Sequence, residues 1–242
     1  MSEDWFAGPV AERYDASLAD EGGGDWGDPA VVGATADFLA ELAADGAALE
    51  LGIGTGRIAL PLAARGVRVH GIDLSADMVA QLRAKPGGDE IPVTIGDFST
   101  TKVAETFSLV YLVFNTIMNL TTQDDQVACF RNAADHLESG GSFVVEVGVP
   151  SKRPLEVFDL GETHVGVDEY DAASQRLVSH HFTLVDARWE RLSMPFRAVS
   201  PAELDLMATL AGMRLGERWC GWKREPFTSD SAKHVSVWEK PE

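Results

Sequence analysis

From residue 30 to residue 150, segments with the apolar pattern of a strand alternate with segments that have the apolar spacing of a helix. Short apolar runs, typical of buried strands, are separated by segments whose apolar residues recur at helical spacing. The predicted strands are AALEL (47–51), VRVHGIDL (67–74), IPVTIGDF (91–98), FSLVYLVFN (107–115) and SFVVEVGV (142–149). The predicted helices cover residues 30–45, 57–66, 75–85 and 122–141. Strands that alternate with helices predict an α/β fold with a doubly wound, mostly parallel sheet.

The pattern changes after Pro150. Residues 164–171 and 176–192 alternate apolar and polar side chains on either side of a short turn, which predicts an antiparallel hairpin. Ser200 followed by Pro201 and Glu203 marks the start of a helix that Gly212 ends. Residues 213–222 and 234–240 predict two last strands. We expect this part of the chain to add antiparallel strands and one helix to the sheet.

The composition narrows the class of protein. The 242 residues carry a formal net charge of −18, which disfavours nucleic acid and anionic membrane surfaces as partners. The N-terminus lacks the features of a signal peptide, and no apolar run is long enough to span a bilayer. Cys129 and Cys220 stand far apart and outside any CxxC pattern, so we expect reduced thiols and a cytoplasmic protein.

The stretch ALELGIGTGR (48–57) contains the most informative motif. Its glycines, Gly52, Gly54 and Gly56, do not match the G-x-G-x-x-G of dinucleotide-binding loops, because the third glycine comes one residue early. No G-K-[ST] follows, so the Walker phosphate loop is excluded as well. Glu50 stands two residues before the first glycine, where its charge would repel a phosphate and attract a cation. The alternative for Glu50 is a solvated or capping carboxylate.

Two further carboxylates end the next two predicted strands. Asp73 closes the second strand, where a carboxylate can accept hydrogen bonds from both hydroxyls of a ribose. Asp97 and Phe98 close the third strand, where a carboxylate beside an aromatic ring can bind an adenine. Asp97 could also be an ordinary turn residue.

This ordered set of motifs resembles the class I S-adenosylmethionine (SAM)-dependent methyltransferase family. The matching pieces are ELGIGTG (50–56), GIDLS (71–75), GDFS (96–99) and HLESGGSFVVEV (136–147), and the resemblance covers residues 30–150. It implies a Rossmann-like, seven-stranded, mostly parallel sheet of order 3-2-1-4-5-7-6 with strand 7 antiparallel. SAM carries a sulfonium and an ammonium and has no phosphate, so it suits a pocket that contains a glutamate.

The resemblance also implies roles for individual residues. The three glycines would let the backbone approach the methionine part of SAM, Glu50 would lie near its ammonium, and Asp73 would hold the ribose. Leu74 and Met78 would pack on the adenine, and Asp97 with Phe98 would contact its edge. The remaining cofactor-binding residues that it implies are Phe114, Asn115 and Thr116 at the end of the fourth strand and Tyr14 in an N-terminal helix.

The acceptor side is less well defined. The layout is similar to that of aminosugar N,N-dimethyltransferases, which often carry histidine where this chain has Asn119, and asparagine cannot act as a general base. Arg197 could pair with an acceptor carboxylate or with surface acids. His180 and His181 are adjacent on a predicted strand and therefore point to opposite faces, as one surface and one core histidine. No Cys, His or Asp spacing indicates a metal site.

We therefore expect a single methyltransferase domain over residues 1–242 that methylates nitrogen or oxygen on a small molecule. Its parts would be an N-terminal helix and loop (1–29), a SAM-binding core (30–150), a substrate-side insertion (151–200) and a C-terminal helix with the last strands (201–242). The loop EGGGDWGDP (21–29) could close over the site as a lid, and an apolar surface on the C-terminal strands could support a homodimer. The alternatives are a non-catalytic SAM-binding protein and a nicotinamide-dependent oxidoreductase.

Overall fold

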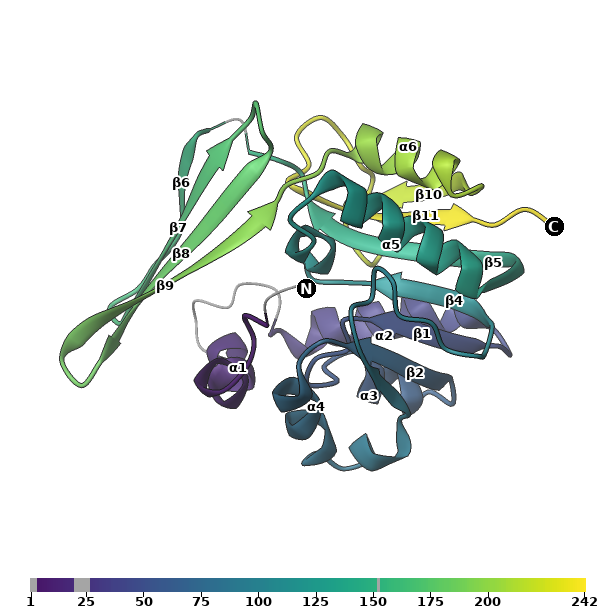
Figure 1. The fold of residues 1–242 in the computed structure, drawn as a ribbon, viewed down its shortest axis with the longest axis horizontal. Coiled ribbons are helices and arrows are strands. Elements are labelled where there is room, and N and C mark those ends of the chain that lie inside the picture. Colours follow the sequence, from purple (N-terminus) through teal and green to yellow (C-terminus); the bar gives the residue numbers. More distant parts are fainter. Residues whose placement is uncertain (1–3, 20–26, 152) are drawn as a thin grey trace.

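The structure is a computed structural model, and it describes residues 4–19, 27–151 and 153–242. Most of residues 21–29, the predicted lid, therefore lies outside the described residues. A seven-stranded sheet crosses the molecule, and a second, four-stranded sheet projects from one end of it (Figure 1). Among the described residues, no helix has the length and apolar character needed to span a membrane.

The seven-stranded sheet has the order β10-β11-β5-β4-β1-β2-β3. Its strands are β1 (Ala47–Leu51), β2 (Arg68–Asp73), β3 (Val93–Ile95), β4 (Phe107–Leu112), β5 (Leu137–Gly148), β10 (Arg214–Trp219) and β11 (Lys233–Glu239). Strands β1 to β5 pair in parallel, whereas β11 pairs antiparallel with β5 and with β10. This arrangement confirms the predicted fold class and strand order, with β10 and β11 as the sixth and seventh strands of the family's numbering.

Helices cover both faces of this sheet, as parallel strands require. They are α2 (Pro29–Ala43), α3 (Ala59–Ala63), α4 (Ala76–Arg83), α5 (Gln123–His136) and α6 (Pro201–Leu210), and α1 (Pro9–Ala19) lies beside α4. Side chains cap four of them at the N-terminus: Asp28 for α2, Ser75 for α4, Thr122 for α5 and Ser200 for α6. Ser200, which the sequence predicts as the start of a helix, is therefore the residue that caps α6.

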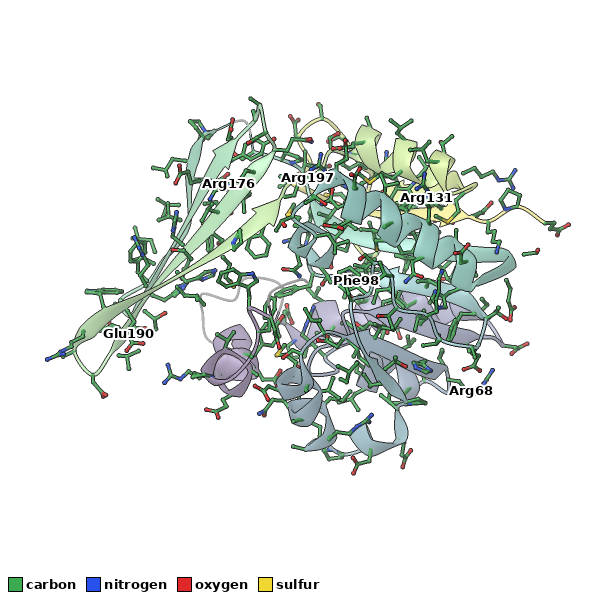
Figure 2. The ribbon with its side chains drawn as sticks, viewed as in Figure 1. Arg68, Phe98, Arg131, Arg176, Glu190 and Arg197 are labelled. Carbon is green, nitrogen blue, oxygen red and sulfur yellow. The ribbon has the colours of Figure 1, made fainter. Side chains whose placement is uncertain are left out.

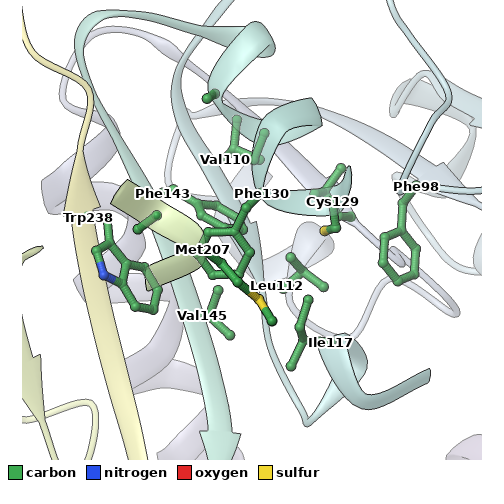
Figure 3. Packing of buried hydrophobic residues seen from close by; sticks show 14 of the residues in the cluster. Phe98, Val110, Leu112, Ile117, Cys129, Phe130, Phe143, Val145, Met207 and Trp238 are labelled. Carbon is green, nitrogen blue, oxygen red and sulfur yellow. The ribbon is translucent and has the colours of Figure 1, made fainter. Parts of the chain in front are cut away.

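The core has two halves, one on each face of the sheet. In one half, Phe130 of α5 packs edge-to-face on Phe143 of β5, with ring centroids 5.0 Å apart, and on Trp238 of β11 at 5.3 Å (Figure 3). The other half lies under α2 and α3 and contains Phe38 and Leu62. Both halves reach the ends of β1 and β4, so the residues that follow these strands rest on a packed base.

The segment after residue 150 differs from the prediction. Strands β6 (Leu155–Leu160), β7 (His164–Asp171), β8 (Arg176–Val185) and β9 (Arg188–Arg197) form a separate antiparallel sheet, and only β10 and β11 join the main one. The predicted hairpin is present as β7 and β8, but the second long run splits at the left-handed residues Asp186 and Ala187 into β8 and β9. The break arises because two consecutive residues with positive φ form a turn.

Some boundaries also differ. The predicted helix at residues 57–66 is helical only over Ala59–Ala63, because the glycine loop extends to Arg57 as turn structure. The predicted helix at residues 122–141 ends at His136, and β5 begins at Leu137 without an intervening loop. Short turn residues thus shift element ends by a few positions without changing the order of elements.

Candidate active site

The glycine loop follows β1 at the edge of the sheet where the parallel strands end. Gly52, Gly54 and Gly56 have φ values of 78°, 53° and 78°, a region that favours glycine. A Cβ on Gly52 would come within 2.6 Å of the Cγ2 of Thr116, and one on Gly56 within 2.3 Å of a Leu82 methyl group. The loop therefore runs too close to its neighbours for side chains, which leaves its backbone exposed to a ligand.

Glu50, two residues before the first glycine of this loop, is buried. Only 3% of it is exposed, and the hydroxyl of Tyr111 donates a hydrogen bond of 2.9 Å to its Oε2 atom. Burial raises the pKa of Glu50 to about 8, although the Tyr111 hydrogen bond and the charge of Arg57 act to lower it. The solvated carboxylate considered above is excluded. A ligand cation beside Glu50 would stabilise its ionised form.

Asp73 connects the glycine loop to the start of α4. Its Oδ2 atom accepts a hydrogen bond of 2.6 Å from the backbone N–H of Gly54, and Oδ1 accepts one of 2.8 Å from Ser75. Burial raises the pKa of Asp73, and these two N–H groups lower it. Met78, in the first turn of α4, places its Cε atom 3.3 Å from the position of a Cβ on Gly54, and Leu74, the residue after Asp73, is half-buried. The predicted ribose and adenine residues are thus grouped around the loop.

Asp97 and Phe98 lie at the next strand end. The Oδ1 atom of Asp97 accepts hydrogen bonds from the backbone N–H and the hydroxyl of Ser99, which form a turn. Phe98 is only 8% exposed and belongs to the core, at the margin of the cluster shown in Figure 3. Its ring lies 3.8 Å from the position of a Cβ on Gly52, so it borders the glycine loop from the side of β3.

The end of β4 is held in an unusual backbone conformation. Phe114 and Asn115 have φ values of 64° and 60°, which are strained for residues other than glycine. Two contacts with β5 hold them: Glu146 Oε2 accepts from the Phe114 N–H at 3.2 Å, and Asn115 Oδ1 accepts from the Gly148 N–H at 2.7 Å. This conformation turns the Phe114 side chain toward the glycine loop, where its ring lies against Arg57.

Arg57 is a site residue that the sequence analysis missed. Its guanidinium lies 4.4 Å from the centroid of the Phe114 ring, a cation–π contact. It lines one cavity together with Tyr14, Glu50, the glycine loop and Thr116. The sequence feature that could have identified Arg57 is its position directly after the third glycine. This position puts a cation opposite Glu50.

Helix α1 brings Tyr14 to this cavity. Its neighbour Asp15 accepts a hydrogen bond of 2.6 Å from the Thr55 hydroxyl, inside the glycine loop, and forms an ion pair of 2.6 Å with Lys85. Burial raises the pKa of Tyr14 to about 12, with Arg57 acting to lower it, so its hydroxyl stays protonated and can donate to a ligand. The predicted placement of Tyr14 at the site agrees with this geometry.

The two predicted acceptor-side residues have different surroundings. Asn119 ends η3 (Thr116–Asn119), a 3₁₀ helix that follows β4 and contacts β9. Arg197 is buried and donates to Gln126, Gln175 and Glu203, with 2.7 Å to the Glu203 carboxylate. The acid that pairs with Arg197 is therefore Glu203, whose side chain is 13% exposed, in contrast to the surface acids considered from the sequence. This network fixes the base of β9 against α5 and α6 (Figure 2).

The adjacent histidines of β8 do point to opposite faces of the second sheet. His180 Nδ1 lies 2.8 Å from the Ser193 hydroxyl, whereas His181 Nδ1 lies 3.1 Å from Nε2 of His164. Both are half-buried, so the predicted division into a surface and a core histidine is wrong. Within the described parts of the chain, no group of three His, Cys, Asp or Glu side chains is arranged to hold a metal ion.

Comparisons with known proteins identify the family of this chain. A family described as "Methyltransferase domain" matches residues 48–141. The CcbJ methyltransferase from Streptomyces caelestis is 36% identical, with a TM-score of 0.83 over 94% of this chain and 96% of that one. A search of the curated proteins gives no match.

Two more distant structures show the same fold. SAM-bound CalS10, an amino pentose methyltransferase from Micromonospora echinaspora, is 21% identical, with a TM-score of 0.67 over 94% of this chain and 96% of that one. DesVI of Streptomyces venezuelae is 21% identical, with a TM-score of 0.72 over 98% and 100%. The glycine loop, the strand order and the identity to CcbJ together show that the chain belongs to the class I SAM-dependent methyltransferases.

Proposed function

We propose that this methyltransferase uses SAM to methylate a nitrogen or oxygen atom of a small-molecule acceptor. The observation that carries the donor side is the buried Glu50 at the entrance to a loop with no room for side chains. Arg57 and Tyr14 line the same cavity. A carboxylate and a guanidinium in one pocket are complementary to an amino-acid end that carries an ammonium and a carboxylate.

The residues present fit this cofactor. Gly52 and Gly54 leave the backbone accessible, and Asp73 would hold the ribose of the bound cofactor. When bound, SAM supplies an electrophilic methyl group on a sulfonium. The residues at the strand ends would hold the donor, and η3 and the second sheet would present the acceptor, so that orientation would supply much of the rate. Asn119 cannot act as a general base. Another group must therefore remove the proton, or the acceptor must be already neutral.

Small molecules are the acceptors best supported. The net charge of −18 disfavours nucleic acids, and CalS10 is an amino pentose methyltransferase. An amine or hydroxyl on a sugar-sized molecule is therefore the acceptor class that we propose. A cytoplasmic location, a homodimer and a single domain over residues 1–242 remain predictions.

Two measurements test this function. Calorimetry should show binding of SAM and of S-adenosylhomocysteine in the micromolar range and no binding of NAD. Transfer of labelled methyl groups from SAM should then be screened over aminosugars, simple amines and hydroxylated aromatics. Failure to bind either sulfur nucleoside at tens of micromolar would refute the donor site, and transfer only to macromolecules would refute the acceptor class.

A further inference from the structure

Glu146 of β5 is a buried acid that is only partly satisfied. It is 2% exposed, and its Oε1 atom has no hydrogen-bond partner within the described residues. Lys233 of β11 places its Nζ atom 4.0 Å from Oε1, which is beyond hydrogen-bond distance. Burying an acid in this way costs stability, whereas an apolar side chain of similar size would not. The hydrogen bond made by the other oxygen, Oε2, accounts for a glutamate at this position.

Glu146 receives both N–H groups of the strained turn that follows β4, the parallel neighbour of β5 (Figure 1). Its Oε2 atom accepts from the Phe114 N–H at 3.2 Å, and its backbone carbonyl accepts from the Asn115 N–H at 3.3 Å. These are the two residues with positive φ, 64° and 60°. Residues other than glycine keep this conformation only where their surroundings hold them. Glu146 therefore supplies two of the contacts that hold the turn.

The turn after β4 lies between β5 and the glycine loop. Val113, Phe114 and Thr116 line the donor cavity together with this loop. The Cγ2 atom of Thr116 lies 2.6 Å from the position of a Cβ on Gly52. The ring of Phe114 has its centroid 4.4 Å from the guanidinium of Arg57. A movement of the turn away from β5 would therefore displace atoms that contact the loop and its arginine.

The acid and the base of the donor cavity are each held by an aromatic residue of β4 or of the turn after it. Tyr111 donates a hydrogen bond of 2.9 Å to Glu50, and the Phe114 ring carries the Arg57 guanidinium. Burial raises the pKa of Glu50 to about 8, and Arg57 acts to lower it. Burial also raises the pKa of Glu146, and Lys233, the Phe114 N–H and Arg57 act to lower it. The charge of Arg57 therefore acts on two buried carboxyl groups.

A pocket that binds both an ammonium and a carboxylate has to keep its own two charges apart. An arginine has many rotamers, and a carboxylate in a site with little water attracts a guanidinium strongly. An aromatic ring competes with that attraction, because a cation–π contact strengthens when the cation is shielded from water. The position of the Phe114 ring therefore sets the position of the Arg57 cation relative to Glu50.

We propose that Glu146 is a positioning residue of the donor site. By holding Phe114 in its left-handed conformation, it places the ring that carries Arg57, and so it keeps this cation in position for the carboxylate of SAM. The inference rests on the proposed use of SAM as the methyl donor. Glu146 is not among the residues that line the donor cavity, so it acts through Phe114 and Arg57 without touching the cofactor.

Two ligands that differ by one carboxylate isolate this effect. Decarboxylated SAM keeps the adenosine, the sulfonium and the ammonium of SAM but lacks its carboxylate. The Kd of decarboxylated SAM divided by the Kd of SAM therefore measures what the contacts to the carboxylate contribute. A general loosening of the fold would weaken both ligands and leave this ratio unchanged. Calorimetry on the wild type should give a ratio of about tenfold or more, as expected for a carboxylate bound by a guanidinium.

Substitutions of Glu146 test its role directly. Glu146→Leu removes the acceptor for the Phe114 N–H and should lower the ratio about threefold or more, because SAM binds more weakly while decarboxylated SAM binds nearly as before. Glu146→Gln keeps an oxygen acceptor for the same N–H and should retain the wild-type ratio. Equal weakening of the two ligands by Glu146→Leu would show a merely structural role and overturn the proposal, as would an unchanged ratio.

A double-mutant cycle tests whether Glu146 acts through Arg57. Arg57→Met should lower the ratio by itself, since it removes the cation that receives the carboxylate. Adding Glu146→Leu to Arg57→Met should lower the ratio no further, because residues that act through one another are not additive. If the two losses add in full, Glu146 does not act through Arg57 and the proposal fails.

Further variants provide a control and a second route. Glu138→Leu replaces an exposed glutamate at the opposite end of β5, and it should leave both Kd values unchanged. If it changes the ratio as much as Glu146→Leu does, the response is not specific and the proposal fails. Should Glu146→Leu not fold, Phe114 still tests the step to Arg57: Phe114→Leu should lower the ratio and Phe114→Tyr, which keeps a ring, should retain it. An unchanged ratio in Phe114→Leu overturns the proposal.

The wild-type measurements separate this inference from the proposed function. If the wild type binds SAM and the variants do not change the ratio as described, the role of Glu146 is refuted while the use of SAM stands. If the wild type binds SAM and decarboxylated SAM equally well, Arg57 does not receive the carboxylate and this inference fails alone. If the wild type binds neither ligand at tens of micromolar, the proposed donor is refuted and the inference fails with it.

Discussion

Replacing Glu50 with glutamine separates the cost of burying this carboxyl group from its use in binding. The pKa of Glu50 rises from 4.5 to about 8 because the group is buried. Each pKa unit corresponds to 1.36 kcal/mol, so ionising Glu50 costs about 5 kcal/mol more in the folded protein than in the unfolded chain. Glutamine keeps the shape and the hydrogen bond from Tyr111, but it does not titrate.

The contribution of Glu50 to the stability of the folded protein should decrease as the pH rises. Between pH 4.5 and pH 8 the folded protein holds the Glu50 proton and the unfolded chain has lost it, so unfolding releases a proton. The contribution of Glu50 to stability is therefore complete below pH 4.5, decreases as the pH rises, and is lost above about pH 8. Glu50→Gln should remove this part of the pH dependence and make the variant more stable than the wild type at pH 8.

SAM binding should show the opposite trend. A ligand ammonium beside Glu50 stabilises the ionised form, so wild-type affinity for SAM should increase with pH up to about 8, by at most tenfold per pH unit. Glu50→Gln should bind SAM more weakly at pH 8, with an affinity that changes little with pH.

Thermal unfolding at several pH values and calorimetry with SAM measure both effects. Glu105→Gln is the matched control, because Glu105 is an exposed acid paired with Arg68. The reasoning is refuted if the melting temperatures of Glu50→Gln and wild type follow parallel pH curves, or if the variant retains the pH dependence of SAM affinity.

Three further substitutions test other parts of the structure. Asp73→Ala removes the acceptor for the Gly54 and Ser75 N–H groups and should reduce SAM affinity at least tenfold in calorimetry, whereas Asp77→Ala on the exposed side of α4 should have a much smaller effect. Gly52→Ala combines a φ of 78° with a contact of 2.6 Å to Thr116, so it should cost about 1–3 kcal/mol in denaturant unfolding and weaken SAM binding. If Gly52→Ala binds SAM as tightly as wild type, the backbone of the loop does not contact the ligand. Arg197→Met leaves the Glu203 carboxylate without its buried partner and should cost about 3–5 kcal/mol in thermal unfolding, against less than about 1 kcal/mol for the exposed Arg176→Met. Equal losses for the two arginine variants would contradict the network described for β9.

The sequence predicted the main sheet well because its signal is local. The buried strand AALEL, the glycines after it and the carboxylates Asp73 and Asp97 at successive strand ends can all be seen within short windows of the chain. The resemblance to a known family then supplied the strand order, including the antiparallel seventh strand. The second sheet was predicted less well, since its strands carry mixed polarity on both faces, and the turn at Asp186 has no glycine or proline to mark it.

The sequence by itself determined which residue types stand at the strand ends, and through its resemblance to a known family it indicated the methyl donor. Tertiary structure decided which groups face one another: Arg57 against Phe114, Arg197 against Gln126, and His164 against His181. Such pairings join residues far apart in the chain, and they depend on how strands and helices pack. Periodicity fixes the face on which a side chain lies, but the partner across that face is set only when the two elements come together.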